Sequence, residues 1–437
     1  MPGVAERYQT AHRAFATNGA AGAPPWLREL RQGALVRFGE LGFPSTRLEA
    51  WRFTNVAPIA ETPFELAGAP RSALPPLQAL EPHLLGDAAP HRLVFVNGHF
   101  SDALSQRTGL PDGVRVGSLA AALVQDGELV RRHLGRIAGF EEHAFRALNT
   151  AFLADGAFIY VPAGVALAQP VQLLFLSVPG AAPHVAHPRN LVVVEREARA
   201  AVIETYATLG DGVYWTNAVT EIVVGDGARV DYHRVQRESE GAYHVASTES
   251  SQGRDSTLHV HAVAFGAALA RHDLRAALDG PGGSCILNGL YLLRGLQHVD
   301  HHTVIDHRQP HCESHEYFNG VLDGGARSVF TGRIIVRPGA QRTDSKQTNN
   351  NLLLSGDAHA DSQPQLEIYA DDVKCTHGST LGPVDEGQVF YLKSRGLDGE
   401  AARRLLTYGF GAEILARIAI APLREQLDRA VRARVWA

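Results

Sequence analysis

Two segments, GDGARVDYHRV (residues 225–235) and GGARSVFTGRIIV (residues 324–336), share one pattern: a glycine-rich turn followed by a strand. Between Ala157 and about Cys375, similar runs rich in β-branched and aromatic residues alternate with Gly-Asp, Gly-Gly or Pro-Gly turns. Self-similarity over so long a region favours a stacked solenoid, in which each coil buries its inner face against its neighbours. A β-sandwich would give equally short strands, and the pattern alone divides these two folds about evenly.

Helical patterns flank the strand-rich region on both sides. Residues 1–155 are expected to be mostly helical, with an amphipathic helix over residues 24–41 that begins with proline. Residues 397–437 are expected to form two helices, the first capped by Asp398 and carrying a broad apolar stripe. We therefore predict three parts, with the strand-rich core at residues 156–396. The C-terminal helices are expected either to cap the solenoid or to dock a partner.

Composition places limits on function. The 437 residues, 45% apolar and 20% charged, are typical of a globular protein with a large core. The 41 basic and 46 acidic residues give a net charge of −5, which argues against nucleic acid or an anionic membrane as partner. The N-terminal residues do not resemble a signal peptide, and no apolar run of about eighteen residues predicts a membrane span. Three widely spaced cysteines do not form a disulfide framework, so we expect a cytoplasmic chain with reduced thiols.

The segment DDVKCTHGSTLG (residues 371–382) carries the most informative chemistry. Residues 373–375 are expected to be a strand, and residues two apart in a strand share a face, so Cys375 and His377 should lie side by side. Thiolate and imidazole are suitable ligands for iron, zinc or an Fe–S cluster. Because clusters usually have four ligands, two residues imply either a second chain or a transient cluster. The alternative is a buried free cysteine beside a hydrogen-bonded histidine.

Histidines are also frequent just upstream. Adjacent histidines face opposite sides of a strand, and the spacing matches no zinc motif, so we expect mostly polar surface residues here rather than a metal site. The segment contains His298, His301, His302, His307, His311 and His315. Cys312 is a candidate for sulfur handling, and Cys285 is expected to be a core thiol. No GxxxxGK[ST], GxSxG or HExxH motif occurs, which predicts no ATP site of the chain's own.

Several longer blocks resemble one protein family. LEIYADDVKCTHGSTLG (residues 366–382) and FYLKSRG (residues 390–396) closely resemble the C-terminal core of the SufB/SufD family, the scaffolds of Fe–S cluster assembly. Lys374 before the cysteine and His377-Gly378-Ser379-Thr380 after it are similar to the SufD branch. Other similar blocks are EAWRFTNV (residues 49–56), LNTAFLADGAFIYVPAGV (residues 148–165), HRQPHCES (residues 307–314) and QRTDSKQTNNNLLLS (residues 341–355).

The resemblance implies a fold and a function. The fold would be a right-handed parallel β-helix flanked by N-terminal and C-terminal helical regions. The chain would be a scaffold and not an enzyme, pairing with SufB through the β-helix edge near residues 370–395 and binding the ATPase SufC through its C-terminal region. His377 and Cys375 would contribute ligands to a nascent Fe–S cluster at the SufB interface, with sulfur delivered by a cysteine desulfurase.

Other assemblies and functions are left open by the sequence. A homodimer is an alternative assembly in the absence of SufB. The rival function is a metal-dependent or polysaccharide-acting β-helical enzyme, and a third is a purely structural solenoid.

Overall fold

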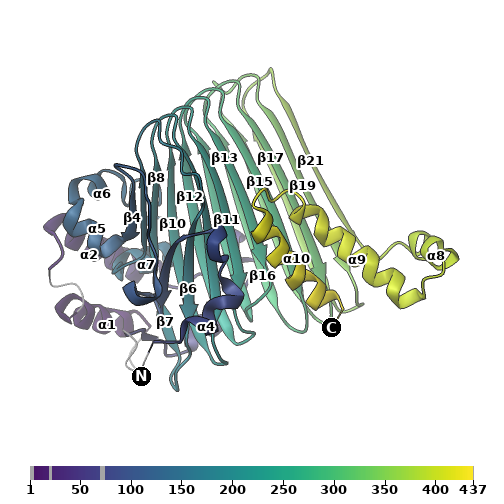
Figure 1. Ribbon diagram of the computed structural model, residues 1–437, viewed down its shortest axis with the longest axis horizontal. Helices are drawn as coiled ribbons and strands as arrows, with labels where there is room; N and C mark the ends of the chain where they lie inside the picture. Colours follow the sequence, from purple (N-terminus) through teal and green to yellow (C-terminus); the bar gives the residue numbers. More distant parts are fainter. Residues whose placement is uncertain (1–3, 19–21, 69–73, 437) are drawn as a thin grey trace.

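The computed structural model describes residues 4–18, 22–68 and 74–436, and it has a long β-solenoid between two groups of helices (Figure 1). The strands form two sheets, which we call sheet A and sheet B, and from β8 onward successive strands alternate between them. Sheet A has the strand order β20-β18-β16-β14-β12-β10-β8-β5-β4, and sheet B has the order β21-β19-β17-β15-β13-β11-β9-β6-β2-β3. From β8 and β9 onward all pairs within each sheet are parallel, which confirms the predicted parallel β-helix.

The strands of the solenoid are mostly about ten residues long. Sheet A contains β4 (Arg115–Ser118), β5 (Ala157–Val161), β8 (Arg189–Val194), β10 (Tyr214–Val224), β12 (Ala242–Gln252), β14 (Leu269–Leu278), β16 (His298–His307), β18 (Arg327–Val336) and β20 (His359–Ile368), with β1 (Glu65–Leu66) and β7 (His184–Ala186) at its margin. Sheet B contains β2 (His91–Val96), β3 (His99–Phe100), β6 (Val171–Ser177), β9 (Arg199–Thr208), β11 (Arg229–Arg237), β13 (Thr257–Ala264), β15 (Ser284–Leu293), β17 (Glu313–Leu322), β19 (Asp344–Leu353) and β21 (Lys374–Gly382).

Coils stack in register, so equivalent residues form rows along the solenoid. In sheet B, Val230 lies between Ala200 of the preceding coil and Leu258 of the next. Alternate residues of each strand point into the bore between the sheets, where they form the largest apolar core of the molecule. The bore is therefore a stack of layers, each completed by its neighbours, in which apolar layers are interrupted by buried hydrogen-bonded polar groups such as Glu204 and His244.

The glycine-rich turns of the sequence have a steric cause. Gly225, Gly253 and Gly280 lie at the same corner of successive coils, after β10, β12 and β14. A Cβ on Gly280 would lie 2.1 Å from the backbone nitrogen of Arg254 in the turn before it. Only glycine lets the turns stack this closely.

Most of the N-terminal helices cover the outer face of sheet A. Trp215 is buried there beneath Phe43, Phe64 and Phe145. The predicted helix over residues 24–41 is confirmed as α2. The helices are α1 (Val4–Asn18), α2 (Pro25–Leu41), α3 (Ala57–Glu61), α4 (Leu77–Leu80), α5 (Leu119–Gln125), α6 (Gly127–His133) and α7 (Ala144–Ala151), with single 3-10 turns η1 (Glu49–Trp51), η2 (Glu81–His83), η3 (Gly86–Ala88) and η4 (Asp102–Leu104).

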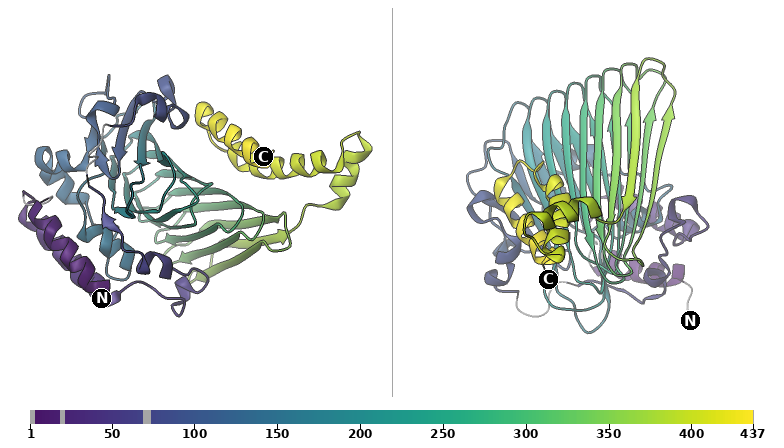
Figure 2. Two further views of the ribbon diagram at one scale, coloured as in Figure 1. Left: turned by 90° about the horizontal axis from the view of Figure 1, so that it is seen from below. Right: turned by 90° about the vertical axis from the view of Figure 1, so that its right-hand side faces the viewer.

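Three C-terminal helices follow the last strand: α8 (Glu386–Ser394), α9 (Gly399–Leu415) and α10 (Ala421–Val435). Figure 2 shows α10 and part of α9 on the opposite side of the solenoid from α1, while α8 projects beyond it. As predicted, Asp398 caps α9, its carboxylate accepting a hydrogen bond from the Ala401 amide at 2.7 Å. None of the helices in these described ranges combines the length and apolar character needed to cross a bilayer.

The strands end earlier than the expected core boundary at residue 396. The last strand stops at Gly382, and a helix begins at Glu386 because Asp385 caps it, accepting from the Gln388 amide at 3.1 Å. The run of Phe390, Tyr391 and Leu392 is apolar and aromatic, so its composition suits a strand as well as a helix.

Gly280→Ala is expected to destabilise the solenoid by about 2 kcal/mol or more, since the new Cβ would overlap backbone that cannot move aside. Gly339→Ala is the matched control, because a Cβ at this turn glycine meets nothing within 4 Å. Urea unfolding followed by circular dichroism measures both. Equal midpoints for the two variants would contradict the steric explanation of the turns.

Candidate functional site

The solenoid has an open end at its last coil. Strand β21 pairs only with β19, so its other edge has no backbone partner among the described strands. Most residues of β21 are exposed. The right-hand view of Figure 2 looks onto this end, where the last strands are not covered by any helix. An unpaired edge of this kind is a ready site for pairing with another chain.

Cys375 and His377 share the inward face of β21, as their spacing predicts. Cys375 lies beside Ser345 of β19, and His377 lies beside Gln347. The cysteine is half-buried and packs near Val336, whereas the imidazole is exposed at the mouth of the bore. Burial raises the pKa of the Cys375 thiol, and the Asp344 carboxylate adds to this effect. The thiol therefore keeps its proton at rest.

Behind these two residues the bore is lined by polar side chains. The inward residues of β19 are Ser345, Gln347, Asn349 and Asn351, and all four are buried. At the positions of Gln347 and His377 in earlier coils the same row carries apolar residues such as Leu287. The last coil thus presents polar side chains to its open mouth.

The polar wall contains a buried carboxyl group. Gln347 Nε2 donates to Glu316 Oε2 at 2.6 Å, in the row that ends at His377. Burial raises the pKa of Glu316 to about 7, although hydrogen bonds from Thr303 and Gln347 act in the other direction. Glu316 and Gln347 were not among the residues predicted from the sequence. For Gln347 the signal was the continuous polar run DSKQTNNN (residues 344–351), which places a polar residue at every inward position.

A second set of bonds fixes the amides of this wall. Tyr291 donates its hydroxyl to Asn351 Oδ1 at 2.7 Å, and Asn349 Nδ2 donates to the Tyr291 oxygen at 3.1 Å. Asn351 Nδ2 in turn donates to Asn349 Oδ1 at 2.8 Å. These three hydrogen bonds form a closed ring that fixes the orientation of the Asn349 and Asn351 side chains.

The chain brings a thiol and an imidazole, both of types that can ligate a metal, together at this end. Among the described residues, no three His, Cys, Asp or Glu side chains are arranged to hold a metal ion. A ligand role for Cys375 and His377 stays a prediction. A cluster with the usual four ligands would need others from outside the chain.

The histidines between residues 298 and 315 do not form one site. The expectation that most lie on the surface is wrong for His301 and His307, which are buried inside the bore. His301 fits there because its ring packs between Tyr291 and Phe318, with centroids 5.4 and 5.5 Å away. His311 and His315 are exposed, and His298 and His302 lie on the outer face of sheet A.

The other two cysteines are buried. Cys285 lies in the apolar core of the bore, which confirms it as a core thiol. Cys312 precedes β17, and its thiol donates to the Gly280 carbonyl at 3.4 Å. Burial raises the pKa of Cys312. A role for Cys312 in sulfur handling stays a prediction.

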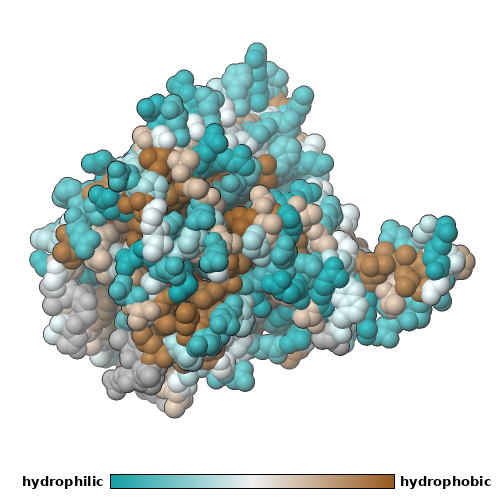
Figure 3. Space-filling model, in the orientation of Figure 1, coloured by the Kyte–Doolittle hydropathy of each residue, from teal (hydrophilic) through white to brown (hydrophobic). Residues whose placement is uncertain are grey.

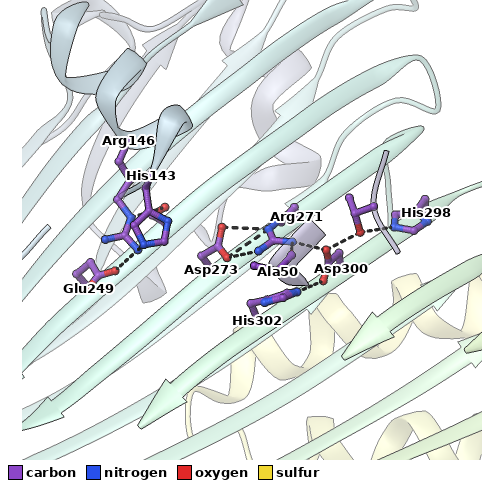
Figure 4. A network of polar contacts seen from close by, with 11 residues as sticks. Ala50, His143, Arg146, Glu249, Arg271, Asp273, His298, Asp300 and His302 are labelled. Atoms are coloured by element: carbon purple, nitrogen blue, oxygen red, sulfur yellow. Dashed lines mark hydrogen bonds and ion pairs between the residues drawn. The ribbon is translucent and has the colours of Figure 1, made fainter. Parts of the chain in front are cut away.

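A buried charge network anchors the block EAWRFTNV to sheet A. Figure 4 shows Arg271 between Asp273 and Asp300, with His302 beside Asp300. Arg271 donates to Asp300 Oδ2 and to the Ala50 carbonyl, each at 2.7 Å, and its guanidinium lies 3.7 Å from the Trp51 ring centroid. Burial would raise the pKa of Asp300, but Arg271 and then His302 outweigh it and hold that pKa well below its usual range.

Because the charges of this network are paired with one another, we assign it a structural role, the attachment of the N-terminal segment to sheet A, and no role in catalysis or ligand binding. Thr54 donates to Asp300 at 2.5 Å and thereby ties the N-terminal segment to β16.

The chain matches two family models along most of its length. Residues 177–410 match "SUF system FeS cluster assembly, SufBD core domain", and residues 4–173 match "SufBD protein N-terminal region". An iron-sulfur cluster assembly SufBD family protein of Synechocystis sp. is 35% identical over 92% of this chain and 90% of its own length. Iron-sulfur cluster assembly protein SufD of Escherichia coli is 30% identical over 98% and 96%, and that of Bacillus subtilis is 29% identical over 94% of each chain.

Glu316→Gln is expected to remove part of the pH dependence of stability. The pKa of Glu316 is raised from 4.5 to about 7 in the folded protein. The protonated carboxyl therefore stabilises the fold fully below pH 4.5, and this contribution is lost as pH rises through 7. The free energy of unfolding of the variant, taken relative to that of the wild type, should therefore increase by up to about 3 kcal/mol between pH 5 and pH 8.

Urea midpoints at pH 5, 6.5 and 8 measure this gain. Glu313→Gln is the control, because Glu313 is exposed on the same strand and should show no such change. An identical pH dependence in the wild type and Glu316→Gln would contradict the buried, protonated carboxyl.

Proposed function

The chain belongs to the SufBD family of Fe–S cluster assembly proteins, and we propose that it is a SufD-like scaffold subunit that offers Cys375 and His377 to a nascent cluster. The observation that carries this proposal is their position. Both lie on the inward face of the last strand, beside an unpaired edge and at the mouth of a polar bore. Neutral imidazole and thiolate both ligate iron in biological sites.

The unpaired edge of β21 supports SufB as the partner that completes the ligand set. A second solenoid that added its own last strand to β21 would satisfy the exposed backbone groups and extend the sheet. Tyr369 and Leu381, exposed by 60% and 56%, would add apolar contact beside that edge. A second copy of this chain is the alternative occupant in the absence of SufB.

The projecting lobe formed by α8 and the start of α9 supports docking of the ATPase SufC. Phe390 and Tyr391 are exposed by 73% and 58%, and Figure 3 shows a hydrophobic patch on this lobe. Exposed apolar patches of this kind mark interaction sites. The apolar faces of the later part of α9 and of α10 are not available for docking, because Ile414 and Leu427 pack on sheet B. Nucleotide-driven movement of SufC would then bias the scaffold between two states.

Sulfur is proposed to arrive from a cysteine desulfurase, with SufB as its main receiver, and the ATPase activity is assigned to SufC. The family membership favours this assembly role over a metal-dependent or polysaccharide-acting β-helical enzyme, which would need a full ligand set or an enclosed carboxylate cluster.

His377→Ala is expected to lower the iron and acid-labile sulfide of the anaerobically purified complex with SufB and SufC at least several-fold, and Cys375→Ala is expected to have a smaller effect. The imidazole is exposed, so its removal leaves the fold intact. His315→Ala removes another exposed histidine of sheet B and should be neutral. Wild-type iron in a correctly assembled His377→Ala complex would exclude the ligand role.

The double substitution Phe390→Asp and Tyr391→Asp is expected to abolish copurification of SufC while leaving the thermal midpoint within about 2 °C of the wild type. Val124→Asp is the control, because Val124 is 86% exposed on α5. Point changes are preferable to truncation, which would uncover the apolar outer face of sheet B. Retention of SufC by the double variant would place the docking surface elsewhere.

A further inference from the structure

Three basic side chains form a row on the outer face of sheet A. His298 lies beside Arg327 of the next coil, and Arg327 lies beside His359 of the coil after that. Neighbouring strands are about 4.8 Å apart, which places one imidazole on each side of the guanidinium. We call these three residues the basic row. It belongs to the other sheet from Cys375 and His377.

The N-terminal segment and the basic row enclose a cavity of about 340 Å³. Thr46, Arg52 and Asn55 line it from the N-terminal segment, and Asp361 of β20 lines it beside the basic row. A volume of this size falls at the lower end of the range for small-molecule sites, which is about 300–1,000 Å³.

The wall opposite the basic row is held in place by the buried charge network (Figure 4). Arg271 donates to the Ala50 carbonyl at 2.7 Å, and the Thr54 hydroxyl donates to Asp300 at 2.5 Å. Because the single hydrogen of Thr54 is used in this way, its oxygen accepts from His298 Nε2 at 3.0 Å. The cavity is therefore preformed, and a ligand would bind with little ordering of the chain.

Two guanidinium groups in this cavity have no counter-charge. Most arginines on the outer face of β14, β16, β18 and β20 are paired with carboxylates, namely Arg271, Arg275 and Arg333. Within the described ranges of the chain, Arg52 and Arg327 have neither a carboxylate within 4 Å nor a hydrogen-bond acceptor. The one carboxylate of the cavity, that of Asp361, lies 3.4 Å from His359 Nε2. Two permanent positive charges thus face one negative charge.

We propose that this cavity binds the phosphate group of a small soluble phosphate ester, with Arg52 and Arg327 as its main ligands. A guanidinium donates two parallel hydrogen bonds to phosphate oxygens. Asn55 adds a donor, because its Oδ1 already accepts from the Ala57 amide at 3.0 Å and its N–H groups remain. These donors come from two facing walls. A tetrahedral group can contact both walls at once, whereas the oxygens of a carboxylate lie in one plane.

Such a ligand would connect parts of the chain that the network leaves unconnected. The hydrogen bonds of Ala50 and Thr54 reach β14 and β16. Arg327 and His359 belong to β18 and β20, so a phosphate group between them and Arg52 extends the attachment to the last coils of sheet A. Binding to the folded chain alone stabilises it by mass action. This role goes beyond cluster assembly and does not depend on Cys375 or His377.

The test uses the full chain, with inorganic phosphate and glycerol 3-phosphate as probes in a chloride buffer of constant ionic strength. Isothermal titration calorimetry should show one site for each probe, with the ester bound at least as tightly, and both should raise the thermal midpoint. Acetate should do neither. Arg52→Gln and Arg327→Gln should each weaken binding by about tenfold or more, because each removes charge-assisted hydrogen bonds.

Arg333→Gln is the matched control, because Arg333 lies on the same outer face and is already paired with Glu367. It should bind both probes as the wild type does. In phosphate-free buffer Arg327→Gln should unfold at the same urea concentration as the wild type or a higher one, since Arg327 lacks a partner in the described chain.

Absence of binding by both probes would overturn the proposal, and so would equal binding of acetate or equal weakening in Arg333→Gln. A lower urea midpoint of Arg327→Gln in phosphate-free buffer would assign that arginine to the fold instead. Vesicles containing phosphatidic acid distinguish a lipid headgroup from a soluble ester. Cosedimentation of the wild type with these vesicles, lost in Arg327→Gln and without binding of glycerol 3-phosphate, would overturn the soluble ligand.

Discussion

In-register stacking of parallel coils is the constraint on which the rest of this structure depends. The edge of each coil exposes backbone N–H and C=O groups and a layer of core side chains, and a neighbouring coil must pair with the first and cover the second. At the first end of the solenoid this requirement is met within the chain, because β3 and β4 pair antiparallel with β2 and β5. At the last end it is not met, since β21 has one neighbour in the described chain.

Stacking also explains where polar groups can be placed inside the bore. A buried polar side chain costs free energy unless it is hydrogen-bonded. In the middle of the stack Glu204, Arg234 and His244 belong to one such hydrogen-bonded cluster inside the bore. In the last coils Glu316, Gln347 and the asparagines of β19 form another, which lies behind Cys375 and His377.

Local patterns predicted the parts of the molecule that depend only on near neighbours. The helix over residues 25–41, the Asp398 cap and the shared face of Cys375 and His377 all follow from spacing within a few residues. The sequence does not show which face of a strand points into the bore, and His301 and His307 were therefore expected at the surface.

The rows of equivalent residues in successive coils could not be predicted from the sequence, because the length of a coil varies. Ser284 and its hydrogen-bonded neighbour Glu313 are 29 residues apart, whereas Ser314 and Ser345 are 31 apart. No fixed period therefore aligns Ser345 with Cys375. These rows follow only from the strand register. The C-terminal helices posed a similar problem, because the apolar stripe of a helix does not show which surface of the solenoid it covers.

The two surfaces proposed for partners are joined by very little chain. Strand β21 ends at Gly382 and α8 begins at Glu386, so residues 383–385 alone connect the unpaired edge to the projecting lobe. The later part of α9 is fixed on sheet B by Ile414 and Leu415, which limits how far the lobe can move without strain. A partner that displaces α8 would therefore act on β21 through this short connection. The strand that carries Cys375 and His377 is then the part of the solenoid most directly exposed to such a force, because the other strands of the stack are paired on both sides or lie farther from the lobe.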